Sequence, residues 1–229
     1  MAGKIITIEG LDGAGKSTQI ELLREKLDQL GIQHRYIHFP MLNQGSYGTL
    51  IAEFLRGEFG NLEEVHPKLV ALLFAEDRNE HKDKLNQWLE EDYVIILDRY
   101  VKSNIAFQCA KIEDNTQKEI LKKWILDFEF GTNQLPKPEA SFFLDVPLQI
   151  IENSLKTERN GADRDYLKGQ KDIHEASISF QQQVLQEYYK LIDENPSNFH
   201  KIACMDSNMN WKSAEVIHDT LFSKIKPLL

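Results

Sequence analysis

The sequence predicts an α/β fold, namely a doubly wound, five-stranded parallel sheet with helices on both faces. Short apolar runs alternate with longer amphipathic stretches, which is the pattern of repeated strand–helix–strand units. Two of the runs, residues 93–98 and 141–146, are nearly continuous in apolar side chains, as central strands covered on both faces would be. A chain of 229 residues fits one domain better than two, so we expect residues 1–229 to form a single domain.

The strands are expected at five apolar segments. These segments are residues 4–9, 34–39, 93–98, 141–146 and 199–205. Longer stretches with helical patterning follow these segments. Each helix would carry the chain back to the end of the sheet where the previous strand began, so the strands would be parallel.

The helices are expected where apolar side chains recur every three or four residues. The first, over residues 16–30, would end at Gly31. A leucine series from Leu69 to Leu89 predicts one unusually long helix over residues 67–90. The remaining helices are expected over residues 103–110, 117–128, 148–158, 174–194 and 211–224.

A polar segment of about residues 159–173 interrupts this pattern. Gly161 and Gly169 lie within it. Segments that close over a bound substrate are often of this kind, so we expect a mobile lid here.

Composition restricts the partners. The 27 Lys and Arg residues and 36 Asp and Glu residues give a formal net charge of -9, which would repel a polyanion, so no nucleic-acid partner is expected. The sequence contains no apolar stretch of membrane-spanning length and no signal-peptide core, so we expect a cytoplasmic protein with no membrane partner. Cys109 and Cys204 are too few for a disulfide framework, and we expect two reduced, buried thiols.

Residues 10–17, with the sequence GLDGAGKS, match the Walker A pattern of a phosphate-binding loop between a strand and a helix. Backbone N–H groups of such a loop surround phosphates, and the helix N-terminus adds partial positive charge. Lys16 would reach the β- and γ-phosphates of ATP, and Ser17 would bind Mg²⁺. The alternative is a glycine-rich turn with an incidental lysine. The expected ATP-binding set is Gly10, Asp12, Gly13, Ala14, Gly15, Lys16, Ser17 and Thr18.

A second pair of candidates ends the third expected strand. Asp98 would emerge at the carboxyl end of a central strand, where open α/β sheets bind ligands, and its carboxylate suits Mg²⁺ or the waters of the ion. Arg99 follows it, and a cation beside phosphoryl oxygens stabilises charge that develops during transfer. The alternative for Asp98 is a helix N-cap.

The acceptor is expected to be a phosphate monoester. A monoester is already largely dianionic near neutral pH, since its second pKa is about 6, so it needs arginines rather than a general base. Arg78 and Arg99 are available. Phe74 lies one turn before Arg78 on the same predicted helix face, so a ring and a cation could hold a base together. The alternative is a core phenylalanine and a solvated helix charge.

Several segments resemble the thymidylate kinase family in order and spacing, and the resemblance spans most of the chain. They are residues 9–18, Phe39-Pro40, Leu72-Leu73-Phe74 with Arg78, Asp98-Arg99-Tyr100, and Ser103-Asn104 with Ala106-Phe107-Gln108. The resemblance implies a fold of the P-loop nucleoside monophosphate kinase type with a lid, and a reaction in which ATP and dTMP give ADP and dTDP.

The resemblance also implies roles on the acceptor side. Asp12 would hydrogen-bond the sugar 3′-hydroxyl, Phe74 would stack on thymine, and Arg78 would bind a base carbonyl. Ser103 and Gln108 would lie near the base edge.

The rest of the implied site surrounds the phosphates. Arg99 would lie beside the transferring phosphate, and Glu9 would help to order the metal and its waters. Phe39, Pro40 and Tyr100 complete the implied substrate-binding set.

The chain departs from the family pattern in its positive charges. Family members often carry an Arg after the Phe-Pro pair, but residues 41–43 here are Met-Leu-Asn. Some members carry an Arg within the phosphate loop, where this chain has Gly13, and others supply the charge from the lid. Arg159 and Arg164 are then the catalytic candidates, and a solvated polar loop is the alternative. His174 occupies a position where an aromatic residue that tests the sugar 2′ position is common.

The expected activity is therefore ATP- and Mg²⁺-dependent phosphorylation of dTMP, which would supply dTTP synthesis, by a chain that the resemblance implies is a homodimer. One alternative is another P-loop kinase that acts on a nucleoside or a different monophosphate. The alternative from a different class is a nucleotide-dependent regulatory switch, although no Asn-Lys-x-Asp guanine-reading motif is present.

Overall fold

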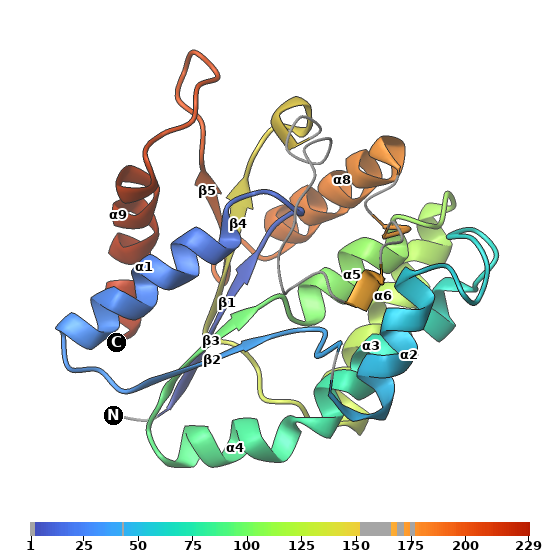
Figure 1. The fold of residues 1–229 in the computed structure, drawn as a ribbon, viewed down its shortest axis with the longest axis horizontal. Helices are drawn as coiled ribbons and strands as arrows, with labels where there is room; N and C mark the ends of the chain where they lie inside the picture. The colour runs from blue at the N-terminus through green and yellow to red at the C-terminus, as the bar shows by residue number, and fades with distance from the viewer. Residues whose placement is uncertain (1–2, 43, 152–165, 169–171, 175–176) are drawn as a thin grey trace.

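The protein is built around one parallel sheet with helices on both faces (Figure 1). A computed structural model describes residues 3–42, 44–151, 166–168, 172–174 and 177–229. The strand order is β2-β3-β1-β4-β5, and every neighbouring pair is parallel. The strands are β1 (Lys4–Glu9), β2 (His34–His38), β3 (Val94–Asp98), β4 (Ala140–Asp145) and β5 (Phe199–Ala203). The predicted fold class is confirmed, and each strand lies within two residues of its predicted ends.

The helices cover both faces of the sheet. They are α1 (Lys16–Gln29), α2 (Gly45–Leu55), α3 (Pro67–Glu80), α4 (Lys82–Glu90), α5 (Val101–Cys109), α6 (Asn115–Leu126), α8 (Ile178–Glu194) and α9 (Ala214–Ile225). Figure 1 shows α1 and α9 on one side of the sheet and α4, α5 and α8 on the other. A π-helical turn, η1 (Asp127–Thr132), continues α6, and a short 3₁₀ turn, η3 (Lys226–Leu228), ends the chain.

The single long helix predicted over residues 67–90 is wrong, because the chain breaks at His81 into α3 and α4. The His81 backbone N–H bonds the carbonyl of Arg78, three residues back, instead of that of Asp77. The His81 ring Nδ1 lies 2.9 Å from the Asp77 carbonyl oxygen. The ring therefore replaces the His81 backbone N–H as the hydrogen-bond partner of the Asp77 carbonyl. A side chain that competes with the backbone in this way ends a helix, and the leucine spacing contained no signal for it.

Helix α2 was not anticipated, although Ile51, Phe54 and Leu55 have helical spacing. These three side chains are buried with Val70 of α3 in a small apolar cluster beside the main core. Because α2 and α3 pack together, this cluster supports one wall of the site described below.

The topology places two loops side by side. β1 leads into α1 on one face and the adjacent β3 leads into α5 on the other (Figure 1), and the carboxyl ends of two strands that diverge in this way are where open α/β sheets bind ligands. Ile8 pairs with Asp98 across the two strands, and the Arg99 N–H donates to the Ile8 carbonyl at 3.0 Å. The phosphate loop therefore begins beside Asp98 and Arg99.

The remaining expectations for the chain have mixed outcomes. The expected lid, residues 159–173, lies largely outside the described residues, as does most of the helix expected over 148–158. Cys109 and Cys204 are free and buried, as predicted, and burial raises the pKa of each thiol to about 12. No helix among the described residues is long and apolar enough to span a membrane.

Candidate active site

A cavity of about 360 Å³ opens at the carboxyl end of the sheet, within the usual size range of small-molecule sites, roughly 300–1,000 Å³. Its walls come from the phosphate loop, β2, α2, α3, β3, α5 and the residues before α8. They are Asp12, Ser17, Tyr36, His38, Phe39, Pro40, Leu42, Leu55, Phe74, Arg78, Asp98, Arg99, Ser103, Asn104, Phe107, Gln108, Tyr166, Asp172 and His174. All the residues expected to bind the acceptor line this cavity except Tyr100, which is buried and whose hydroxyl donates to the Pro136 carbonyl.

The phosphate loop has the backbone that its sequence predicts. Gly13 and Gly15 have φ angles of 84° and 86°, in the left-handed region that side-chain-bearing residues rarely adopt. Gly15 is the N-cap of α1, so the free N–H groups of the helix point toward the carboxyl end of the sheet. This geometry binds anions.

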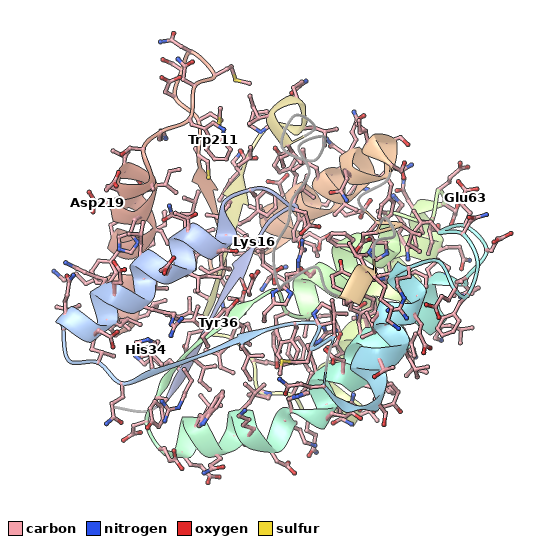
Figure 2. The ribbon with its side chains drawn as sticks, viewed as in Figure 1. Lys16, His34, Tyr36, Glu63, Trp211 and Asp219 are labelled. Atoms are coloured by element: carbon pink, nitrogen blue, oxygen red, sulfur yellow. The ribbon has the colours of Figure 1, made fainter. Side chains whose placement is uncertain are left out.

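Lys16 lies at the start of α1, near the centre of the molecule, whereas Trp211 and Glu63 lie toward its periphery (Figure 2). The Lys16 Nζ donates to the carbonyls of Gly10 at 3.3 Å and Leu11 at 3.1 Å. Burial, together with repulsion from Arg99, lowers the pKa of Lys16, although nearby carboxylates oppose this shift. The ammonium is thus held within the loop by two neutral carbonyls, which phosphate oxygens can replace, and it lies 3.8 Å from Asp12 Oδ1.

Asp98 is buried at the carboxyl end of β3, and only one of its two carboxylate oxygens has a hydrogen-bond partner among the described residues. Its Oδ2 lies 3.1 Å from His38 Nδ1, whereas its Oδ1 has no hydrogen-bond partner in the described part of the chain. Burial opposes ionisation, but Lys16 and the His38 hydrogen bond outweigh it, so the pKa of Asp98 lies below its ordinary value. Ser17 lines the same cavity. An ionised carboxylate and a hydroxyl are oxygen ligands of the kind Mg²⁺ takes, so these residues fit the ion.

Arg99 is held from three sides. Its Nη2 donates to Asp12 Oδ1 at 2.8 Å, its Nη1 donates to Ser103 Oγ at 3.3 Å, and its guanidinium lies 5.0 Å from the centre of the Phe107 ring. Its φ of 66° is left-handed, which costs a side-chain-bearing residue of the order of 1 kcal/mol and is common at functional sites. The strained turn directs this cation back over the phosphate loop.

Glu9 is fully buried and is not among the described wall residues of the cavity. Its oxygens accept hydrogen bonds from Ser103 Oγ at 2.6 Å, Tyr188 Oη at 3.1 Å and the Tyr100 N–H at 3.1 Å. Burial raises the pKa of Glu9, and the Ser103 hydrogen bond and the charge of Arg99 only partly offset that effect. Its contacts therefore fix the Arg99–Ser103 turn rather than face the cavity.

The far end of the cavity is aromatic. The rings of Phe74 and His174 are near-parallel, with centroids 6.3 Å apart, and the Phe107 ring lies 5.2 Å from that of His174. Burial lowers the pKa of His174 well below its ordinary value, so the imidazole is neutral. The Gln108 Oε1 is buried without a hydrogen-bond partner among the described residues. Flat walls with an unsatisfied acceptor suit a planar ring that carries an N–H group.

Arg78 is buried on α3, with 2% of its surface exposed, so the alternative of a solvated helix charge is wrong. Arg78 lines the cavity, and its guanidinium pairs with Glu129. Together with His38 and Tyr188, Glu129 belongs to the part of the site that sequence reasoning missed. None of these three residues lies in a motif, and only their packing in the fold brings them to the site. Phe107 lies in one of the family-like segments, but no role in the site was expected for it.

Lys111, just after α5, lies beside this aromatic wall. Its Nζ is 4.8 Å from the centre of the Phe54 ring and has no hydrogen-bond partner in the described ranges. Burial lowers the pKa of Lys111 to about 7, and Asp172 offsets this only in part. In the unfolded chain, the Lys111 ammonium has a pKa near 10.5 and stays protonated above pH 7. In the folded chain, Lys111 loses its proton there.

The free energy of unfolding should therefore rise with pH above about 7, by up to about 1.4 kcal/mol per pH unit from this group. Lys111→Met should remove that rise, and Lys84→Met on the exposed face of α4 serves as the matched control. Urea titrations between about pH 6.5 and pH 9 measure the difference between the variant and the parent. Parallel pH profiles for Lys111→Met and the parent would contradict a neutral Lys111.

Comparison with known proteins identifies the family. The family model for thymidylate kinase matches residues 8–212. The chain is 34% identical over 191 residues to a probable thymidylate kinase of Pyrobaculum aerophilum, covering 82% of this chain and 86% of the relative. It is 32% identical over 187 residues to the thymidylate kinase of Mycobacterium tuberculosis, covering 82% and 85%. The solved structure of the Candida albicans enzyme superposes with a TM-score of 0.71 at 27% identity, over 99% of this chain and 92% of that one. This chain therefore belongs to the thymidylate kinase family.

Proposed function

We propose that this chain transfers the γ-phosphoryl group of ATP to the 5′-phosphate of dTMP, giving ADP and dTDP. The observation that carries the proposal is the single cavity that joins a phosphate end, with Ser17, Asp98 and Arg99, to an aromatic end, with Phe74 and Gln108. A nucleoside monophosphate has the same two-ended chemistry. Family membership supports thymine as its base and ATP as the donor.

On the donor side, the backbone of residues 10–18 would surround the ATP phosphates, and Lys16 would neutralise charge as it builds on the transferring group. Ser17 and Asp98 would hold Mg²⁺, which supplies charge neutralisation at the donor oxygens. Glu9, expected among the metal ligands, is too enclosed by its own donors to bind the ion directly, and it would act by fixing Ser103 and Tyr100.

On the acceptor side, Arg99 would bind the acceptor phosphate between the carboxyl ends of β1 and β3, where the two strands lead to helices on opposite faces of the sheet. Asp12, which accepts a hydrogen bond from Arg99, would also accept one from the sugar 3′-hydroxyl. Phe74 would stack on the base, and Gln108 Oε1 would accept the ring N–H. Catalysis would then consist of positioning and electrostatic stabilisation of an in-line transfer.

The lid arginines stay a proposal, because Arg159 and Arg164 lie outside the described residues. One of them would supply the cation that Gly13 cannot. If the double variant Arg159→Ala/Arg164→Ala turns over at the parent rate, that proposal is wrong.

A homodimer and a cytoplasmic location also stay proposals. Leu69 of α3 and Ile120 of α6 are apolar and more than half exposed, and Lys68 lies over the Trp124 ring between these helices. A second copy packed here would cover both side chains. Light scattering should give twice the chain mass for the parent protein and the chain mass for Leu69→Glu/Ile120→Glu. A monomeric parent would overturn the dimer.

One coupled assay of ADP release tests the function. Thymidine, dTMP, dUMP, dGMP and AMP are offered with ATP and Mg²⁺, and we expect dTMP to have the highest kcat/KM. Preferred transfer to thymidine or to a purine monophosphate would establish the other P-loop kinase instead. ADP release that is slow and independent of every acceptor would indicate a switch.

A further inference from the structure

The buried carboxylate of Glu129 forms the back of the cavity wall at Arg78. Glu129 lies in the π-helical turn η1, and its side chain is 0% exposed. The turn widens the helix and brings this carboxylate under α3, the helix that carries Arg78. Neither of its oxygens reaches water.

The contact between the two side chains is bidentate. Arg78 Nε donates to Glu129 Oε2 at 2.6 Å, and Arg78 Nη2 donates to Glu129 Oε1 at 2.7 Å. Asn104 Nδ2 holds the same Oε1 at 2.9 Å and the Ala71 carbonyl at 3.0 Å. Because a guanidinium has five N–H donors in a fixed plane, this pairing sets the direction of the three that Glu129 does not use.

The pair is also compensated in charge. Burial disfavours the cation, but the carboxylate outweighs that effect, and the pKa of Arg78 is raised. A guanidinium whose charge is already matched gains little from a second anion, whereas its remaining N–H groups still bond a neutral oxygen. It offers donors only, so an amino group placed against it stays unpaired.

We propose that Glu129 is a positioning residue that determines base specificity: it fixes Arg78 as a neutralised, donor-only wall, so that the cavity selects a pyrimidine with a carbonyl rather than an amino group at ring position 4. The inference rests on the proposed function, since it assumes that the acceptor base reaches Arg78.

The test compares Glu129→Gln with Glu76→Gln. Glu76 is the matched control, because it ties the end of the same turn to α3 through Asn133 without contact to Arg78. The readouts are KM and kcat for dTMP, dCMP and ATP, together with calorimetric affinities for dTMP and dCMP in the absence of ATP. Thermal melting reports whether each variant is folded.

For Glu129→Gln we expect the affinity for dTMP to fall at least about tenfold, the preference for dTMP over dCMP to fall by a similar factor, and KM for ATP to stay within about twofold. Glu76→Gln should leave all three within about twofold. Equal losses for ATP and dTMP, or unchanged discrimination in a folded variant, would overturn the proposal.

If Glu129→Gln does not fold, Glu129→Asp decides the question, since it keeps the charge but shortens the reach to Arg78. Parent-like discrimination in Glu129→Asp would then overturn the proposal, and reduced discrimination would support it. The calorimetric affinities separate the proposed role of Glu129 from the proposed reaction. A parent protein that binds dTMP over dCMP but transfers nothing would remove the proposed reaction and leave the Glu129 assignment intact.

Discussion

We expect Lys16→Ala to lower kcat for dTMP phosphorylation by roughly 10²–10³, equivalent to about 3–4 kcal/mol of transition-state stabilisation. The Lys16 ammonium is buried, donates to the Gly10 and Leu11 carbonyls, and lies 3.8 Å from Asp12 Oδ1. It needs little rearrangement to meet the charge that builds on the transferring phosphoryl group. Steady-state kinetics at saturating ATP and dTMP measure the effect.

The control for this prediction is Lys26→Ala, which removes a lysine from the last turn of the same helix, away from the phosphate loop. Its kcat should stay within about twofold of the parent value. A Lys16→Ala protein that is folded and turns over at nearly the parent rate would remove Lys16 from the active site.

The second large effect concerns stability. Arg78→Met leaves the Glu129 carboxylate buried with Asn104 as its remaining hydrogen-bond partner among the described residues, and an uncompensated buried charge costs about 3–5 kcal/mol. The double variant Arg78→Met/Glu129→Gln should recover most of that loss, because the charge is removed and an amide oxygen still accepts from Asn104. Urea denaturation gives the free energy of unfolding of each protein.

Arg24→Met, on the exposed surface of α1, controls for the loss of an arginine and should change stability by less than about 0.5 kcal/mol. Where Arg78→Met is folded, KM for dTMP should rise roughly tenfold or more while KM for ATP is little changed. If the single and double variants unfold at the same urea concentration, the buried pair does not carry the energy assigned to it.

Local patterns were sufficient to predict the sheet and the phosphate end of the site. Apolar runs identify strands because a central strand is buried on both faces. The phosphate loop is a contiguous motif whose glycines adopt backbone angles that other residues avoid. Asp98 and Arg99 follow from the rule that ligands bind at the carboxyl ends of parallel strands. Each of these inferences depends on residues that are close in sequence.

The sequence by itself therefore determined the strands, the phosphate loop and the candidate residues of the cavity, whereas the tertiary structure decided their partners. The break at His81 depends on one imidazole reaching one carbonyl, which the leucine period does not encode. The pairing of Arg78 with Glu129 joins residues 51 positions apart. A buried charge is stable only with a partner in contact, and only the packing of α3 against the turn after α6 shows which carboxylate that partner is.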